Sequence, residues 1–277
     1  MSAICIRAID LHHHYNGEIP ALNGVDLEIT SGTYLAVVGQ NGSGKTTLVK
    51  HFNGLLKPTT GRVLLHDRDT RTVPLADLAR TVGYAFQNPD HQIFCANTRD
   101  EIAFGPGNLG VAGEQLAQRV DETLTAFGLT PYADVPPAVL GYGLRRKVAV
   151  AAIYAMRPDV LVLDEPTSGL DYRSACDLMA LVDGLHAQGH TIILVTHDMR
   201  LVAEHAHEVL VMHDGRVMDR GTPAEVFWHE DVMRTAQIEP PQIVALARRL
   251  SRFGLPRDLL NVPTMARAWR ELVEGGE

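Results

Sequence analysis

The sequence predicts an α/β protein built around a mainly parallel β-sheet. Three short apolar runs rich in β-branched residues, at 33–39, 159–165 and 191–197, alternate with segments of helical length. A chain of 277 residues with 45% hydrophobic residues can bury a large core. We therefore expect one globular α/β unit, with helices covering the sheet.

The order of the elements suggests two additions to this core. Residues 88–157 interrupt the strand and helix alternation, with a helix expected over 113–127 and another over about 144–156. The stretch 213–223 predicts a hairpin turn followed by the start of a helix, and helical spacing returns in "EPPQIVALARRL" and "PTMARAWRELVE". We expect a main domain over 1–220, a helical insertion over about 88–157, and a small helical C-terminal region over 221–277.

Composition excludes several classes of protein. The net charge of −8 disfavours nucleic acid as a partner, because phosphate backbones are bound by basic surfaces. The three cysteines form no CxxC pair, so neither a disulfide framework nor a zinc site is expected, and a reducing compartment fits. No apolar run approaches 18 residues and the first 20 residues lack a secretion signal, so we expect neither a membrane span nor export by that route.

The segment "GQNGSGKTT" at 39–47 fits the phosphate-loop pattern G-x-x-x-x-G-K-[ST], and it follows the apolar run "YLAVV" and opens a helical segment. Glycines let backbone N–H groups surround phosphate oxygens, Lys45 neutralises charge, and Thr46 offers a hydroxyl to Mg²⁺. The predicted nucleotide-binding residues of this loop are Gly39, Gln40, Asn41, Gly42, Ser43, Gly44, Lys45, Thr46 and Thr47.

Three polar residues follow other predicted strands. Asp164 and Glu165 end the run "DVLVLDE", where the first carboxylate can hold magnesium and the second can polarise a water that attacks the γ-phosphate. His197 follows the strand "TIILV" and can hydrogen-bond the γ-phosphate or that water. Together with the phosphate loop, these residues predict ATP and Mg²⁺ as ligands.

In combination, "GQNGSGKTT", "FQNPD", "LVLDEPTSGLD" and "VTHD" occur in an order that resembles the ATP-binding-cassette ATPases. The resemblance covers residues 1 to about 220. It implies a RecA-like core with an antiparallel β subdomain and a helical subdomain. It also implies that Gln87 senses Mg²⁺ and the γ-phosphate alongside Thr46 and Asp164, that "SGLD" (168–171) lines a dimer seam, that His197 is the switch histidine, and that Tyr15 stacks on adenine.

More narrowly, "NPDHQIF" and "DEIAFGPGNLG" resemble the ATPase subunit of an energy-coupling factor transporter. In that family the first segment docks on a membrane coupling subunit, which makes Asp90 and Gln92 candidate contacts; the alternative is a solvated loop with a capping Asp. The resemblance implies a peripheral position at the cytoplasmic face of the membrane, with a separate membrane subunit capturing a vitamin or a metal ion such as cobalt or nickel. The C-terminal helices would help hold two ATPases together, or simply pack as amphipathic helices.

One family motif is altered. Cassette ATPases usually carry Leu-Ser-Gly-Gly-Gln at the start of a helix that caps the γ-phosphate of ATP on the partner subunit. Here the matching signature segment (140–144) reads Leu140, Gly141, Tyr142, Gly143 and Leu144. Because Gly141 lacks the serine hydroxyl and Tyr142 replaces a glycine, we expect weakened hydrolysis of the partner's ATP and a heterodimer with an intact-signature partner. The following "RRK" (145–147) is expected to be a solvated helix face near phosphate; the alternative is that one of its members helps position the partner's ATP.

Three other functions stay open at this point. The chain could serve another class of transporter, act as a soluble cassette ATPase on DNA or ribosomes, or be a regulatory subunit that hardly hydrolyses ATP. The lack of a second cassette or basic extension disfavours the soluble class, and Glu165 disfavours the regulatory reading.

Overall fold

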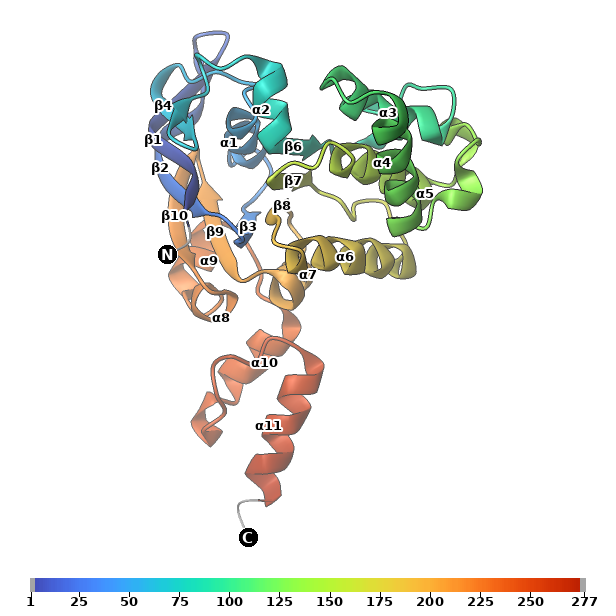
Figure 1. The fold of residues 1–277 in the computed structure, drawn as a ribbon. Helices are drawn as coiled ribbons and strands as arrows, with labels where there is room; N and C mark the ends of the chain where they lie inside the picture. The colour runs from blue at the N-terminus through green and yellow to red at the C-terminus, as the bar shows by residue number, and fades with distance from the viewer. Residues whose placement is uncertain (1–2, 275–277) are drawn as a thin grey trace.

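The computed structural model describes residues 3–274, and it contains two β-sheets (Figure 1). The larger, six-stranded sheet has the order β10-β9-β3-β8-β7-β6. Its neighbouring strands are parallel except for the antiparallel hairpin β9–β10. The strands are β3 (Tyr34–Val38), β6 (Val82–Ala85), β7 (Val160–Asp164), β8 (Thr191–Val195), β9 (Glu208–His213) and β10 (Arg216–Gly221). The three predicted apolar strands are β3, β7 and β8, and every residue of each is buried, as expected for a sheet covered on both faces.

The second sheet is antiparallel and has the order β2-β1-β4-β5. Its strands are β1 (Ile4–Tyr15), β2 (Ile19–Thr30), β4 (Thr60–Leu65) and β5 (Arg68–Asp69). Helix α1 (Lys45–Phe52) lies between the two sheets, where Leu48, Val49 and Phe52 join one core with residues of both. This packing fixes the start of α1 against the ends of the parallel strands.

Helices form the other side of the molecule, at the right in Figure 1. They are α3 (Thr98–Asn108), α4 (Gly113–Ala126), α5 (Tyr142–Tyr154) and α6 (Tyr172–Ala187), with short 3₁₀ turns at Pro89–His91, Thr130–Tyr132 and Pro137–Val139. Helix α2 (Leu75–Thr81) packs against β6, and α7 (Met199–His205) follows β8. Helices α3, α4 and α5 make up the insertion expected over about 88–157, and they share a second buried core with β7, β8 and α6. Helix α5 begins two residues before the expected Leu144, so the signature segment includes its first turn.

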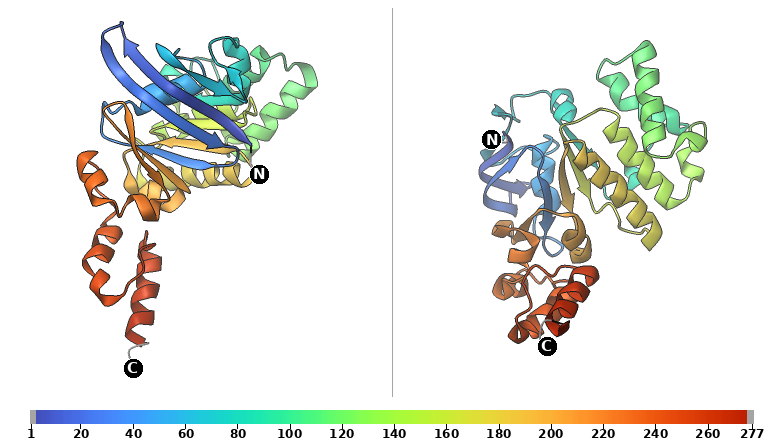
Figure 2. Two further views of the ribbon diagram at one scale, coloured as in Figure 1. Left: turned by 90° about the vertical axis from the view of Figure 1, so that its left-hand side faces the viewer. Right: turned by 60° about the horizontal axis from the view of Figure 1, so that its bottom comes forward.

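The C-terminal part is helical, as expected. It contains α8 (Pro223–Val226), α9 (Glu230–Thr235), α10 (Gln242–Arg249), a 3₁₀ turn at Ser251–Phe253, and α11 (Val262–Glu274). A capping box between Thr222 and Glu225 starts α8. Helices α10 and α11 project away from the two sheets (Figure 2), and Trp228 connects their small core to the rest of the protein. Within residues 3–274, no helix is both long and apolar enough to cross a membrane.

Candidate functional site

The predicted phosphate loop connects β3 to α1 and needs its glycines for steric reasons. Gly39 has φ 151° and a Cβ there would lie 2.3 Å from the carbonyl oxygen of Met212. Gly44 has φ 100°, and a Cβ would lie 2.7 Å from the carbonyl oxygen of Ala21. Positive φ and close backbone contacts both require glycine, so these residues set the loop conformation in front of the α1 N-terminus.

Lys45 lies across this loop and is only 7% exposed. Its Nζ donates hydrogen bonds to the carbonyl oxygens of Gly39, at 2.8 Å, and Gln40, at 2.9 Å. Burial lowers the pKa of the Lys45 ammonium, and the carboxylates of Glu165 and Asp164 partly oppose that effect. A largely desolvated ammonium beside open backbone N–H groups is suited to bind a polyanion such as a triphosphate.

Asp164 at the end of β7 is held by hydroxyl groups from two other elements. Thr46 Oγ1 donates to Asp164 Oδ2 at 3.1 Å, and the Tyr84 hydroxyl on β6 donates to the same oxygen at 2.6 Å. Burial and the Asp164 charge raise the pKa of Tyr84, so the phenol stays a donor. Neighbouring oxygens of an octahedral magnesium ion lie roughly 2.9 Å apart, so the hydroxyl and carboxylate oxygens here fit that ion. Tyr84 was not predicted, although it lies on the same face of "VGYAF" as Val82 and Phe86.

Glu165 and His197 form a pair next to this carboxylate. His197 Nδ1 lies 2.8 Å from Glu165 Oε1, which joins the two residues that were predicted at separate strand ends. Glu165 has φ 48°, an uncommon value for a residue with a side chain, and its N–H donates to the carbonyl oxygen of Val195 at 2.8 Å. A carboxylate held in this way can act as a base toward a water molecule.

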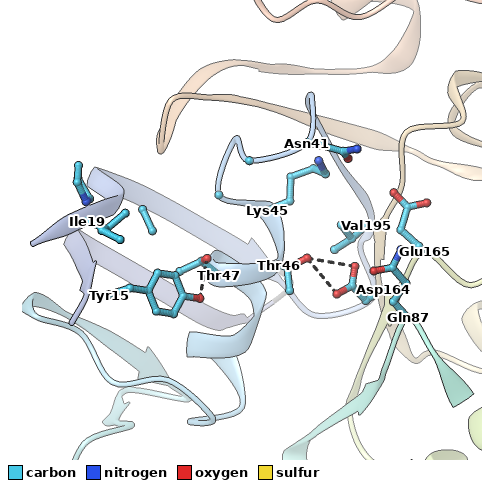
Figure 3. A pocket seen from close by; sticks show the side chains of 14 residues that line it. Tyr15, Ile19, Asn41, Lys45, Thr46, Thr47, Gln87, Asp164, Glu165 and Val195 are labelled. Atoms are coloured by element: carbon cyan, nitrogen blue, oxygen red, sulfur yellow. Dashed lines mark hydrogen bonds between the residues drawn. The ribbon is translucent and has the colours of Figure 1, made fainter. Parts of the chain in front are cut away.

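A cavity of about 310 Å³ connects the phosphate loop with Asp164 and Glu165 (Figure 3), whereas His197 lines a separate hollow beside Gly39 and Asn41. Its lining includes Asn41, Lys45, Thr46, Thr47, Gln87, Asp164 and Glu165, together with Tyr15, Ile19, Pro20 and Ala21 of the antiparallel sheet. Figure 3 shows the polar side chains at one end and the Tyr15 ring at the other. The Tyr15 and Thr47 hydroxyls hydrogen-bond each other at 3.1 Å, and the Tyr15 ring packs edge-on against His13. The cavity can therefore hold a nucleotide whose flat base lies beside Tyr15 while its phosphates reach Lys45.

The three residues predicted after β6 have different surroundings. Gln87 is exposed and lines the cavity. Asp90 is exposed and lies 3.5 Å from Arg145, measured between Oδ1 and Nε. The Gln92 amide makes internal hydrogen bonds: it accepts from the Phe86 N–H at 3.2 Å and donates to the Ala149 carbonyl at 2.7 Å. Asp90 is thus available for an external contact, while Gln92 binds the chain after β6 to α5.

The signature segment lies away from the cavity, which none of its residues lines. Gly141 is the N-cap of α5, and a Cβ there would meet no atom within 4 Å. The Tyr142 ring packs on Gly169 of "SGLD", where a Cβ would lie 3.1 Å from Tyr142 Cε1. Gly143 approaches Ser174 of α6 at a similar distance, with 3.1 Å from a Cβ to Ser174 Oγ.

One expectation for the segment that follows is wrong. Residues 145–147 were predicted to form a solvated helix face, but Arg146 is only 1% exposed. Its guanidinium points into the protein because two backbone carbonyl oxygens accept hydrogen bonds from it, those of Phe86 and Glu165. The sequence shows only three consecutive basic residues on a helix, and this pattern does not indicate which of them faces the protein interior.

The fold and the cavity define the class of protein. The parallel strand β3, a glycine loop with a buried lysine, and a hydroxyl–carboxylate pair at the end of β7 form a phosphate-loop nucleotide-binding site. The paired Glu165 and His197 add the groups that such a site needs for hydrolysis of a phosphoanhydride.

Comparisons with known proteins identify the family. Residues 22–168 match the ABC transporter family. A putative ABC transporter ATP-binding protein of Caldanaerobacter subterraneus subsp. tengcongensis is 46% identical over 252 residues, which are 91% of this chain and 44% of that protein. The chain thus spans less than half of that relative. It covers nearly all of another, the energy-coupling factor transporter ATP-binding protein EcfA1 of the same organism, with 41% identity over 271 residues that are 95% of this chain and 98% of that protein.

A solved structure agrees with this result. The structure of cbiO1 from Clostridium perfringens, described as part of the ABC transporter complex cbiONQ, matches with a TM-score of 0.76 and 34% identity over 91% of this chain and 97% of that one. The chain therefore belongs to the ATP-binding-cassette ATPases of the ABC transporter family, and its resemblance to energy-coupling factor ATPases is confirmed.

Proposed function

We propose that this chain is the ATP-hydrolysing subunit of an energy-coupling factor importer. The observation that carries the proposal is the cavity lined by Lys45, Thr46, Asp164 and Glu165, together with the hydrogen bond from His197 to Glu165 at its edge. Likeness to EcfA1 and to cbiO1 supports the importer class. The imported solute, in this proposal a vitamin or a metal ion such as cobalt or nickel, is selected by a separate membrane-embedded subunit.

The residues have the following roles in this proposal. ATP lies with its adenine against Tyr15 and its phosphates in the loop 39–47, where Lys45 and the α1 N-terminus face them. Thr46, Asp164 and Gln87 are the magnesium ligands, directly or through water, and the ion would neutralise phosphate charge. Glu165 accepts the proton of the attacking water, and His197 orients Glu165 and contacts the γ-phosphate.

The proposed assembly is a head-to-tail dimer with a second ATPase. The described cavity has no contribution from the signature segment, and the segment's α5 N-terminus is partly open to solvent. Gly141 has no hydroxyl and the Tyr142 ring is packed on Gly169, so this segment offers a partner's ATP only backbone groups. We infer a heterodimer in which ATP on this chain is hydrolysed fast and ATP on the partner slowly.

The proposed docking surface for the membrane coupling subunit is an apolar hollow of about 380 Å³ beside α3. Its lining includes Leu75, Phe94, Phe104, Met156 and Gln92. Phe94 is 64% exposed and Phe104 is 46% exposed, although their rings pack edge-to-face with 4.6 Å between the ring centroids. Exposed aromatic rings in a hollow are typical of a protein contact, and this hollow adjoins the predicted docking residue Gln92.

Co-purification tests the function. Full-length chain isolated from its native membranes should bring with it a second ATPase and membrane proteins, whereas isolation without any membrane protein would favour a soluble cassette ATPase. Phe104→Asp should release the membrane proteins while ATP still binds. The control Met218→Asp, which changes an apolar side chain of similar exposure (41%) on β10, should leave the complex intact.

A further inference from the structure

The buried Arg146 connects three parts of the molecule. Its Nη1 donates to the carbonyl oxygen of Phe86 at 2.6 Å, and its Nη2 donates to the carbonyl oxygen of Glu165 at 2.8 Å. Phe86 directly precedes Gln87, so one guanidinium on α5 holds the backbone at the proposed γ-phosphate sensor and at the proposed general base.

Burying a guanidinium at this position is energetically costly, because its charge loses contact with water. Desolvation lowers the pKa of Arg146, and the Asp164 and Glu165 charges only partly oppose that effect. An apolar side chain would avoid the desolvation. What arginine adds is a rigid fork with several donors, which lets one side chain hold two carbonyl groups at a fixed separation.

Phe86 is held by α5 from both sides. Its carbonyl accepts from Arg146, and its N–H donates to Gln92, whose amide nitrogen in turn donates to the carbonyl of Ala149 on α5. The peptide before Gln87 therefore moves with α5, because shifting it alone would break partly buried hydrogen bonds.

Glu165 depends on its surroundings in a different way. Its φ of 48° is unfavourable for a residue with a Cβ, and such a conformation persists where neighbouring groups hold it. Its carbonyl accepts from Arg146 and also from the Ser168 N–H at 3.2 Å. Loss of the guanidinium would leave this carbonyl with one donor fewer and let the Glu165 backbone relax, which displaces the carboxylate from His197.

We propose that Arg146 is a positioning residue that transmits the placement of α5 to Gln87 and Glu165. The first turn of α5 contains Tyr142, Gly143 and Leu144. Contacts between this turn and the partner subunit therefore determine whether this chain's own site can hydrolyse ATP. The inference rests on the proposed function, since it assumes that α5 faces the partner's nucleotide. It links the two nucleotide sites of the dimer through one side chain.

The test compares Arg146→Met and Arg146→Lys with the control Arg157→Met, which removes an exposed arginine paired with Glu122 just after α5. Each full-length variant is studied in the assembly that hydrolyses ATP, by kcat, KM and the Hill coefficient for ATP. We expect Arg146→Met to lower kcat about tenfold or more, to change KM less than about threefold, and to bring the Hill coefficient to 1. Arg157→Met should match the wild type.

Arg146→Lys keeps a buried cation but cannot span both carbonyl groups, so its kcat should lie between those of wild type and Arg146→Met. If Arg146→Met does not fold, Arg146→Lys provides the test. Its kcat and its cooperativity for ATP must then both be lower than those of the wild type. Unchanged kcat and cooperativity in the variants, or a rise of KM alone, would overturn the inference. A wild-type assembly without ATP hydrolysis would instead overturn the proposed function.

Discussion

His197 Nδ1 lies 2.8 Å from Glu165 Oε1, so the side chains that follow β7 and β8 form one hydrogen-bonded pair. In the tautomer with the proton on Nδ1, the imidazole donates to the carboxylate and its Nε2 is left for another contact. The His197 side chain is 68% exposed, whereas that of Glu165 is 10% exposed. In the proposed function, the exposed histidine contacts the γ-phosphate while it orients the buried carboxylate.

The first prediction concerns this pair. His197→Ala removes both the orientation of Glu165 and the phosphate contact, so kcat should fall about 100-fold. The affinity for ATP should change little, because Lys45 and the loop 39–47 remain. Steady-state hydrolysis and equilibrium ATP binding measure the two quantities. An unchanged kcat would show that His197 has no part in the reaction.

The second prediction concerns Tyr15. If its ring stacks on the base, Tyr15→Ala should weaken ATP binding by about 5- to 150-fold, since base–aromatic stacking contributes about 1–3 kcal/mol. Tyr15→Phe keeps the ring and loses only the hydrogen bond to Thr47, so its affinity should stay within about threefold of wild type. Titration of each variant with ATP measures both constants. Equal losses in the two variants would assign the effect to the hydroxyl.

The third prediction concerns pH and the fully buried His51 of α1. Burial lowers the pKa of His51 from 6.5 to about 4. In the unfolded chain His51 binds a proton near pH 6.5, whereas in the folded chain it does so only near pH 4. The free energy of unfolding therefore decreases as the pH falls from about 6.5 to about 4. The loss amounts to about 3 kcal/mol when complete.

His51→Gln cannot titrate, and it serves as the comparison. The free energy of unfolding, measured from pH 8 to pH 4, should fall less steeply for this variant than for the wild type. The carboxylates contribute equally to both curves, so the difference isolates His51. Parallel curves below pH 6.5 would mean that His51 is protonated in the folded protein.

The fourth prediction restores the altered signature segment. Gly141→Ser, Tyr142→Gly and Leu144→Gln together should speed hydrolysis of the partner's ATP about tenfold, the value of one charge-assisted hydrogen bond. The fold allows the serine, because a Cβ at Gly141 meets nothing within 4 Å. Combining the triple variant with Glu165→Gln leaves the partner's ATP as the one being hydrolysed. Gly141→Ala adds the Cβ without the hydroxyl and should give no gain.

Strong local patterns predicted much of this molecule. The strands β3, β7 and β8 were recognisable because they are buried on both faces and therefore continuously apolar. The loop 39–47 was recognisable because its chemistry requires fixed residue types at fixed positions. Both features depend on neighbours in the sequence, which a single sequence displays directly.

Features that depend on distant contacts were not predicted. Tyr84 reaches Asp164 across 80 positions, and Arg146 turns inward to carbonyl groups 60 and 19 positions away. No regular spacing in the sequence indicates the contacts of these two side chains, because β6, β7 and α5 come together only in the folded chain. The role of Gln92 was also incomplete, since its internal hydrogen bonds to Phe86 and Ala149 cannot be read from "NPDHQIF".

We propose that ATP bound to this chain is hydrolysed with its own Glu165 as the base, once an intact-signature partner completes the site. ATP turnover by the reconstituted pair with Glu165→Gln in this chain alone tests this role. Turnover should fall below about a tenth of the wild-type rate while ATP stays bound and the pair stays closed. If the pair instead keeps most of its turnover, and loses it only when the partner's equivalent carboxylate is changed, Glu165 is not the base.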